Sequence, residues 1–108
     1  MLKESNILKS IRLWCGQNNI LCFRCNVGKF KTDNGWIDTG LPNGWSDLVL
    51  LLPKGRFVFV ECKNATGKLR EDQVRFANAV TALGFEYLVA RDVSDVQNFL
   101  AQNPNRAI

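Results

Sequence analysis

A strand–turn–strand pattern in the middle of the chain constrains the fold more than any other sequence feature. After Asp47, residues 48–52 form a continuous apolar run that stops at Pro53-Lys54-Gly55. Residues 56–63 form the next run, which is rich in the valine and phenylalanine that strands favour. Because Lys54-Gly55 supplies a turn between two runs of strand length, we predict a buried antiparallel hairpin over residues 47–63.

The part of the chain before this hairpin predicts a helix, a strand and a long polar segment. Residues 4–18 have helical periodicity, and the apolar residues of one face are Ile7, Leu8, Ile11 and Trp14. Residues 20–25 have the composition of a short strand. Residues 26–45 are polar and contain glycines, with residues 36–39 as a candidate edge strand.

The part after the hairpin predicts a helix, a strand and a second helix. Residues 70–83 form the first helix, which ends at Gly84, and its expected inward residues are Val74, Ala77, Val80 and Thr81. Residues 85–90 form the strand, and Ser94 caps a last helix that carries Val96, Phe99 and Leu100. The order α-β-β-β-α-β-α predicts an α/β domain with a mixed sheet flanked by helices, and a right-handed parallel crossover between the last two strands.

The composition excludes several kinds of catalytic site. The chain has no histidine. This rules out Ser-His-Asp and Cys-His nucleophile systems and any metal site built on imidazole. Any chemistry must therefore use carboxylates, lysine, thiols or backbone groups. The net charge of +4 is compatible with a polyanionic partner but does not by itself indicate one.

Length and hydropathy predict one cytoplasmic domain. A chain of 108 residues fits a single domain over residues 1–108. No apolar run approaches the roughly 18 residues of a membrane span, and the N-terminus lacks the apolar stretch of a signal peptide. We therefore expect a cytoplasmic protein with no membrane partner, whose four cysteines are reduced thiols. The shortness of the chain suggests that it is encoded by a bacterial host or a phage.

The predicted hairpin places three charged side chains at one end of the sheet. Side chains alternate along a strand, so Glu61 and Lys63 point to the same face, and Val58, Val60 and Cys62 point to the other. Asp47 begins the partner strand, and antiparallel pairing brings the start of one strand beside the end of the other. Asp47 and Glu61 are therefore expected to converge.

Two converging carboxylates favour a site for a hard divalent cation. They repel each other unless a cation neutralises them, and Mg²⁺ commonly uses one or two carboxylates together with waters and phosphate oxygens. The ion would polarise a scissile phosphate, while Lys63 would orient or deprotonate the attacking water and stabilise charge on phosphorus. The pattern predicts phosphodiester hydrolysis. The alternative interpretation is a surface Glu61–Lys63 ion pair with Asp47 capping a turn.

Three sequence segments, in order, resemble a nuclease family. They are Gly44-Trp-Ser-Asp47, Phe57-Val-Phe-Val-Glu61-Cys-Lys63 and Gly67-Lys-Leu-Arg-Glu-Asp-Gln73. Together with Glu4 and Asn26-Val-Gly28 they look like the virus-type replication-repair nuclease (VRR-NUC) domain of the PD-(D/E)XK superfamily. The resemblance covers nearly the whole chain and implies a restriction-endonuclease-like core and a Mg²⁺- or Mn²⁺-dependent nuclease. Ser46 stands where the superfamily name has proline.

The resemblance also implies roles for individual residues. Asp47 and Glu61 would be metal ligands and Lys63 the catalytic lysine. Gln73 would bond the water or phosphate from the second helix. Glu4 would support the metal directly or through water, and the backbone carbonyl of Cys62 would be a further ligand. Taken alone, a glutamine in the first turn and a glutamate at a helix N-terminus are both ordinary.

Basic and aromatic residues around the motifs are candidates for contacting DNA. The basic residues, which would bind phosphates, are Lys29, Lys31, Lys54, Arg56, Lys68, Arg70 and Arg75. The aromatic residues ahead of Asp47 are Phe30, Trp36 and Trp45, which either stack on an unpaired base or wedge a branch point, or seal the core.

Cys22 and Cys25 form a C-x-x-C pattern that invites a zinc or redox interpretation. An offset of three on a strand points their side chains to opposite faces, which disfavours shared chelation. Cys15 and Cys62 fit core positions on other elements.

We therefore expect a Mg²⁺-dependent DNA endonuclease that acts on branched DNA such as Holliday junctions or flaps, without a small-molecule cofactor. A homodimer is expected because a domain of this size has a limited core and one active site. The alternatives are a restriction-type endonuclease and an inactive DNA-binding module on the same fold.

Overall fold

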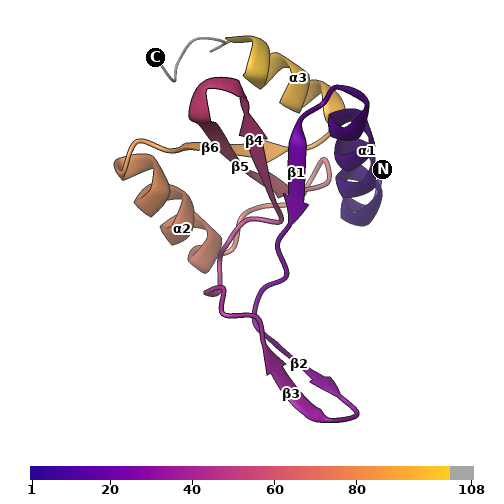
Figure 1. Ribbon diagram of the computed structural model, residues 1–108, viewed down its shortest axis with the longest axis vertical. Coiled ribbons are helices and arrows are strands. Elements are labelled where there is room, and N and C mark those ends of the chain that lie inside the picture. The colour runs from indigo at the N-terminus through magenta and orange to yellow at the C-terminus, as the bar shows by residue number, and fades with distance from the viewer. Residues whose placement is uncertain (103–108) are drawn as a thin grey trace.

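The computed structural model describes residues 1–102 as a mixed sheet between helices, with a hairpin that projects from it (Figure 1). The elements in chain order are α1 (Glu4–Gln17), β1 (Leu21–Arg24), β2 (Lys29–Thr32), β3 (Gly35–Asp38), β4 (Leu48–Leu52), the 3-10 turn η1 (Pro53–Gly55), β5 (Arg56–Cys62), α2 (Glu71–Ala82), β6 (Glu86–Ala90) and α3 (Val93–Gln102). Among the described residues, no helix has the length and apolarity needed to cross a membrane.

The predicted central hairpin is confirmed. β4 and β5 pair antiparallel, with Leu48 opposite Val60 at one end and Leu52 opposite Arg56 at the other. Lys54 and Gly55 make the turn with φ of 64° and 73°. Glycine adopts this left-handed conformation without steric cost, which explains why a strand can reverse here.

The central sheet has the strand order β1-β4-β5-β6. β1 pairs antiparallel with β4, whereas β6 pairs parallel with β5. The parallel pair is joined through α2, as the strand–helix–strand pattern predicts. The predicted mixed sheet and the order of its elements are therefore confirmed.

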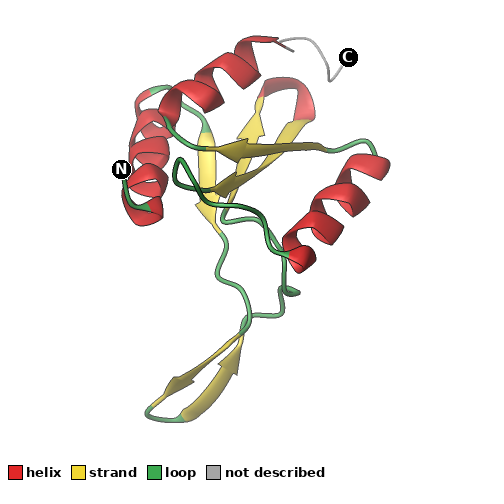
Figure 2. Ribbon diagram, turned by 180° about the vertical axis from the view of Figure 1, so that it is seen from behind, coloured by secondary structure: helices red, strands yellow, loops and turns green. Residues whose placement is uncertain are grey.

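The alternating side chains of β4 and β5 serve two separate cores. Leu50 and Val58 face α1 and α3, together with Val96 of α3. Val49 and Phe59 face α2 on the other side of the sheet. Figure 2 shows the same layers from behind. Glu61 lies on the α2 side because it shares its parity with Phe59.

Two details of the helices differ from the predictions. The structure turns Gln73, Phe76 and Val80 of α2 inward, and it leaves Val74 and Thr81 exposed. The helix is rotated in this way because the sheet presents an aromatic cluster and a carboxylate, which hydropathy does not reveal.

The start of α3 is the second difference. Ser94 lies inside α3, and the Asp92 carboxylate caps it by accepting hydrogen bonds from the Asp95 backbone N–H (3.0 Å) and from Ser94 Oγ (2.6 Å). These hydrogen bonds lower the pKa of the Asp92 carboxyl, that from Ser94 having the largest effect.

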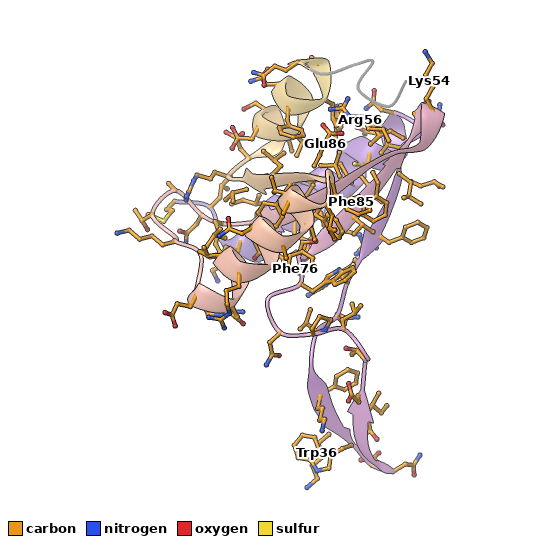
Figure 3. The ribbon with its side chains drawn as sticks, turned by 90° about the vertical axis from the view of Figure 1, so that its left-hand side faces the viewer. Trp36, Lys54, Arg56, Phe76, Phe85 and Glu86 are labelled. Carbon is orange, nitrogen blue, oxygen red and sulfur yellow. The ribbon has the colours of Figure 1, made fainter. Side chains whose placement is uncertain are left out.

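A two-stranded hairpin, β2–β3, extends away from the body, and we call it the arm (Figure 3). Its strands pair from Lys29–Asp38 to Thr32–Gly35, and a backbone hydrogen bond from Thr39 N–H to Gly28 O (3.0 Å) closes its base. Residues 36–39 were expected as a possible edge strand, and a strand forms there as β3. The strand pairs with β2, which the polar composition of residues 26–45 concealed.

Candidate active site

A cleft of about 540 Å³ lies where β4 begins and β5 ends. Its charged lining residues are Glu4, Asp47, Glu61, Arg24, Lys63 and Arg70. A second depression of about 500 Å³, between α1 and β1, is lined by basic and apolar side chains without a carboxylate. Of these two hollows, only the first therefore combines acidic and basic groups.

The register of the hairpin brings Asp47 to Glu61, as predicted. Asp47 precedes Leu48, which is opposite Val60, so the next position along β5 is Glu61. Asp47 Oδ2 accepts a hydrogen bond of 2.8 Å from the Cys62 backbone N–H. This bond holds one oxygen of the half-buried Asp47 carboxylate at the end of β5 and orients the side chain toward the cleft.

Glu61 is a buried carboxylate with one unpaired oxygen. It is only 2% exposed, and Oε1 has no hydrogen-bond partner. Its other oxygen, Oε2, accepts a hydrogen bond from Gln73 Nε2 (3.2 Å) and lies 3.8 Å from Lys63 Nζ. Burial raises the pKa of the Glu61 carboxyl to about 8, and the Asp47 carboxylate adds to the shift against the lowering effect of Lys63.

Lys63 is buried beside Glu61, on the same face of the strand. Its backbone N–H donates to Ala90 O (3.1 Å), which continues the β5–β6 pairing one residue past the end of β5. The backbone of Lys63 is thereby fixed in the alternation that points its ammonium group to the Glu61 side. The structure brings together the three charged residues that parity and pairing predicted.

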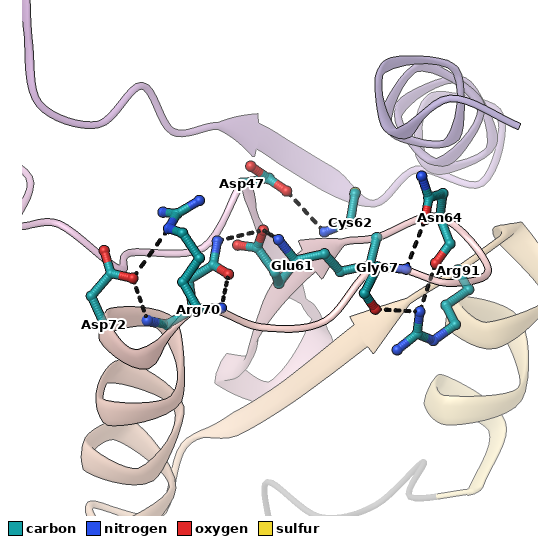
Figure 4. Close-up of polar contacts among 10 residues, drawn as sticks. Asp47, Glu61, Cys62, Asn64, Gly67, Arg70, Asp72 and Arg91 are labelled. Carbon is teal, nitrogen blue, oxygen red and sulfur yellow. Dashed lines mark hydrogen bonds and ion pairs between the residues drawn. The ribbon is translucent and has the colours of Figure 1, made fainter.

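Gln73 connects α2 to this carboxylate. Its Oε1 accepts a hydrogen bond from the Arg70 backbone N–H (2.9 Å), while its Nε2 donates to Glu61. Arg70 and Glu61, the two residues that this side chain joins, are labelled in Figure 4. The side chain therefore completes the N-terminus of α2 and positions Glu61 at the same time. The predicted place of Gln73 near the site agrees with this geometry, and α2 begins one residue later than expected, at Glu71.

Gly44 allows the loop before Asp47 to pack against the start of α2. Its φ is +93°, and a Cβ atom at this position would lie 2.3 Å from the carbonyl oxygen of Asp72. No side chain fits there without moving backbone, so glycine is required on both grounds. The sequence motif contains Gly44, but only the structure reveals what it approaches.

Arg91 holds the loop between Lys63 and α2, a role that the sequence did not suggest. Its Nη1 donates to the backbone oxygens of Asn64 (2.6 Å) and Gly67 (2.8 Å). Asn64 Oδ1 in turn accepts from the Gly67 N–H (2.8 Å), which closes the loop on itself. No local sequence signal links Arg91 to a loop so far away in the chain.

Glu4 lines the same cleft from the start of α1. A Cβ atom placed on Gly67 would lie 3.3 Å from Glu4 Oε2 and 3.4 Å from Lys63 Cδ, so the three residues are neighbours. Within residues 1–102, no three His, Cys, Asp or Glu side chains gather closely enough to hold a metal ion together. Support of a metal by Glu4 stays a prediction, and this spacing favours the indirect form through water.

Comparison with known proteins identifies the family to which this chain belongs. A family model described as the VRR-NUC domain matches residues 2–94, which include every residue of the cleft. The chain belongs to the VRR-NUC family. A solved structure described as a "VRR_NUC domain" matches with a TM-score of 0.69 and 21% sequence identity, and the match covers 94% of this chain and 97% of that one. No curated protein matches the chain.

These matches confirm the predicted family and fold. The VRR-NUC family is a nuclease family, and the structural likeness shows the PD-(D/E)XK type of core. A nuclease domain implies DNA as its substrate.

The basic residues that were predicted to contact DNA lie in three environments: exposed around α2 and on the arm, in the turn far from the cleft, and, for Arg56, buried between β5 and β6. Lys68, Arg70 and Arg75 are exposed around the start of α2, where Arg70 lines the cleft, and Lys29 and Lys31 are exposed on the arm. Lys54 lies in the turn at the opposite end of β4 and β5, so it does not adjoin the cleft (Figure 3).

The prediction that Arg56 contacts a DNA phosphate is wrong. The Arg56 guanidinium is buried and bonds both carboxylate oxygens of Glu86 (2.8 and 2.9 Å) and the Leu100 carbonyl (3.0 Å), so it is not available to a phosphate. Arg24, which the sequence analysis did not select, instead lines the cleft at the end of β1. Arg24 precedes Cys25, whose backbone N–H donates a hydrogen bond to the Asp47 carbonyl oxygen (2.8 Å). This contact between β1 and the start of β4 brings Arg24 to the cleft, and the sequence alone does not reveal it.

The aromatic residues divide between core and surface. Trp45 lines the cleft but packs into the core, with ring centroids 5.4 Å from Phe59 and 5.0 Å from Phe76. Phe30 and Trp36 on the arm are exposed. The prediction that these aromatic residues seal the core is therefore correct for Trp45 and wrong for Phe30 and Trp36.

The C-x-x-C pair lies as the strand alternation predicts. Cys22 packs against the core on the α1 side and Cys25 against the core on the α2 side, so their thiols face opposite sides of β1. Both are free thiols, as are the buried Cys15 and Cys62.

Proposed function

We propose that this VRR-NUC domain is a divalent-metal-dependent deoxyribonuclease that hydrolyses phosphodiester bonds. The observation that carries the proposal is the buried Glu61 carboxylate, with an unpaired Oε1, beside Asp47 and Lys63 in an open cleft. A carboxylate in this setting is costly to ionise unless a cation neutralises it.

The donor set fits a hard cation such as Mg²⁺. Asp47 and Glu61 would hold it, with the backbone carbonyl of Cys62 and, through water, Glu4 as further ligands. One or two carboxylates completed by waters and phosphate oxygens are usual for Mg²⁺, and Mn²⁺ accepts the same oxygen ligands. When bound, the ion would supply positive charge that polarises the scissile phosphate and lowers the pKa of a water ligand.

The protein's own residues supply the remaining functions. Lys63 would orient the attacking water and stabilise the negative charge that develops on the phosphate. The bond from the water oxygen to phosphorus forms as the bond from phosphorus to the departing sugar oxygen breaks, and the proton that the water loses is balanced by one that the departing oxygen takes from solvent. Gln73 holds Glu61 Oε2 in place and thereby leaves the unpaired Oε1 for the metal. The charge of Arg24 and Arg70 on the cleft wall would attract the phosphates on either side of the scissile one.

The preferred substrate we propose is branched DNA such as a Holliday junction or a flap, cut by a homodimer. Each chain has one cleft with few basic residues around it, so it contacts few phosphates alone. Two copies related by a two-fold axis would double this surface and hold two clefts at a fixed separation.

A cleavage panel tests the proposed function. Labelled duplex, flap, single-stranded and four-way-junction DNA are incubated with Mg²⁺, Mn²⁺, Ca²⁺ or EDTA. We expect cleavage with Mg²⁺ or Mn²⁺, binding with little turnover in Ca²⁺, and none in EDTA. Binding without cleavage under every condition would favour an inactive DNA-binding module. Equal cutting of all duplexes at one sequence would favour a restriction-type endonuclease.

A further inference from the structure

The arm begins and ends in the wall of the cleft. Cleft residues 24–27 lead into β2, and cleft residues 44, 45 and 47 follow the return from β3. Phe30 on the arm itself also lines the cleft. A DNA strand that lies across Asp47 and Glu61 therefore passes the root of the arm.

The strand register separates the arm's side chains onto two faces. Residues directly opposite each other in an antiparallel pair project to the same side. Phe30 pairs with Ile37 on the face that meets the cleft. Lys31 pairs with Trp36 on the other face. Each face thus carries one aromatic ring, and the ring of Trp36 lies beside a lysine.

Neither ring is used to stabilise the body of the protein. Phe30 is 47% exposed and Trp36 is 70% exposed, and no residue of the arm belongs to either core. A two-stranded hairpin alone is only marginally stable in water. The exposed rings on this element are therefore free to bind a ligand.

We propose that the arm binds unpaired nucleobases of DNA at the catalytic cleft, with Phe30 as the stacking platform on the cleft face and Trp36 as a second platform on the opposite face of the arm. Bases inside a duplex already stack on one another, so only bases of a flap, bulge or junction offer a free face. An aromatic ring beside a cation suits a nucleotide, because the ring takes the base while the ammonium group takes the phosphate. This proposal rests on the proposed nuclease function, because it places the substrate by the catalytic cleft.

The arm's position in the cleft wall favours DNA over a second copy of the chain as the ligand. Phe30 is continuous with the surface that holds Asp47 and Glu61, so whatever fills the cleft meets this ring. The two lysines of the arm, Lys29 and Lys31, both lie on the Trp36 face, since they occupy alternate positions of β2. Asp38 lies opposite Lys29 on the same face, so Lys31, which is opposite Trp36, is the lysine suited to a backbone phosphate.

The test compares two labelled duplexes of identical sequence, one fully paired and one with a short unpaired bulge. The variants are Phe30→Ala, Trp36→Ala and the conservative Trp36→Phe, with Leu83→Ala as a matched control. Leu83 is 76% exposed just after α2 and lies outside the cleft. Melting temperature confirms folding, and DNA affinity in Ca²⁺ is measured beside kcat/KM in Mg²⁺.

We expect each alanine variant to lower the bulged-to-paired ratio of affinity and of kcat/KM by roughly tenfold, the scale of one lost base–aromatic stack. Trp36→Phe should retain most of the ratio, and Leu83→Ala all of it. An unchanged ratio in both alanine variants would overturn the proposal. So would conversion of a dimer to a monomer by these variants, because a second copy would then be the ligand.

The two proposals fail in distinguishable ways. If the wild-type protein cuts neither DNA, the nuclease proposal fails, and the affinity ratio in Ca²⁺ still decides whether the arm binds unpaired bases. If the wild type cuts DNA and the ratios do not change, only the proposal for the arm fails.

Discussion

At the residue scale, the site depends on a carboxylate that the fold keeps in an unfavourable state. Glu61 is buried, lies beside the like-charged Asp47 and has one oxygen without a partner. Gln73 and Lys63 satisfy the other oxygen. Such an arrangement costs stability in the absence of a cation, and it is characteristic of functional sites rather than of ordinary surface ion pairs.

The active-site assignment predicts the effects of three substitutions. Asp47→Asn, Glu61→Gln and Lys63→Ala should each lower the cleavage rate by at least ~10²-fold while the protein stays folded, because each removes a metal ligand or a charge stabiliser. Both carboxylate variants should bind DNA as tightly as the wild type or more tightly, since they remove negative charge. Glu71→Gln, at an exposed carboxylate outside the cleft, is the matched control. Cleavage that survives in any of the three would refute the assignment.

The raised pKa of Glu61 predicts how stability depends on pH in the metal-free protein. The carboxyl titrates near its usual value of 4.5 when unfolded and at about 8 when folded. Between these values the folded state binds more protons than the unfolded state, so this group's contribution to the free energy of unfolding falls as pH rises. Thermal melts in EDTA should show that decline, and it should be smaller in Glu61→Gln. Equal slopes in the two proteins would contradict the prediction.

At the element scale, capping hydrogen bonds within the first turn decide where the two later helices begin. α3 starts at a carboxylate, not at the serine that the sequence pattern favours, because Asp92 reaches the Asp95 N–H. α2 starts where Gln73 bonds the Arg70 N–H. Near each helix start, several polar residues have side chains that could cap the helix. Which of them accepts the backbone N–H depends on the conformation of the backbone there.

The cap of α3 gives a direct stability test. Asp92→Ala should lower the free energy of unfolding by about 1 kcal/mol, the usual cost of losing an N-cap. Ser94→Ala should have a smaller effect, because Ser94 Oγ donates to the Asp92 carboxylate, whereas Asp92 is the side chain that accepts from a backbone N–H of the helix. Urea denaturation measures both. A larger loss in Ser94→Ala would show that Ser94 is the cap.

The ion pair between β5 and β6 predicts a strong asymmetry between single and double variants. Arg56→Met should destabilise the protein by about 3–5 kcal/mol, because Glu86 is left buried without its partner. Replacing both, as Arg56→Met with Glu86→Leu, should recover much of that loss. Urea denaturation provides the measurement. DNA affinity of the folded double variant should be unchanged, and a clear loss would restore Arg56 as a phosphate contact.

At the scale of the whole molecule, the body and the arm have different tasks. The body uses two cores to hold the cleft at one end of the central sheet. The arm extends the longest dimension to 45 Å and carries exposed rings beyond the core. This division separates the positioning of the catalytic residues from contact with the rest of the substrate.

A homodimer that cuts branched DNA is the prediction at this scale. Light scattering at micromolar protein should give twice the chain mass of 12.2 kDa, and a cruciform plasmid should be cut on both strands. Two active sites at fixed separation are needed for paired cutting. A monomer that only nicks the cruciform would refute the dimer and leave the hydrolytic chemistry standing.

The sequence by itself determined the central sheet and the three charged residues of the site. Strand periodicity is local, so the runs on either side of Pro53-Lys54-Gly55 predict a hairpin without tertiary information. Once the hairpin is accepted, alternation places Glu61 and Lys63 together and pairing places Asp47 beside them. The family resemblance, confirmed by the match to residues 2–94, added Gln73 and the nuclease class.

Only the tertiary structure decided which polar residues are buried and which aromatic residues are exposed. Arg56 reads as a surface cation until its partner Glu86 is known, and Trp36 reads as core until its strand is seen to pair away from the main sheet. Arg91 acquires its role through a loop that is distant in the chain. The physical reason is the same in each case. Hydropathy and spacing report the preference of a segment, whereas burial and hydrogen bonding depend on partners that only the folded chain brings together.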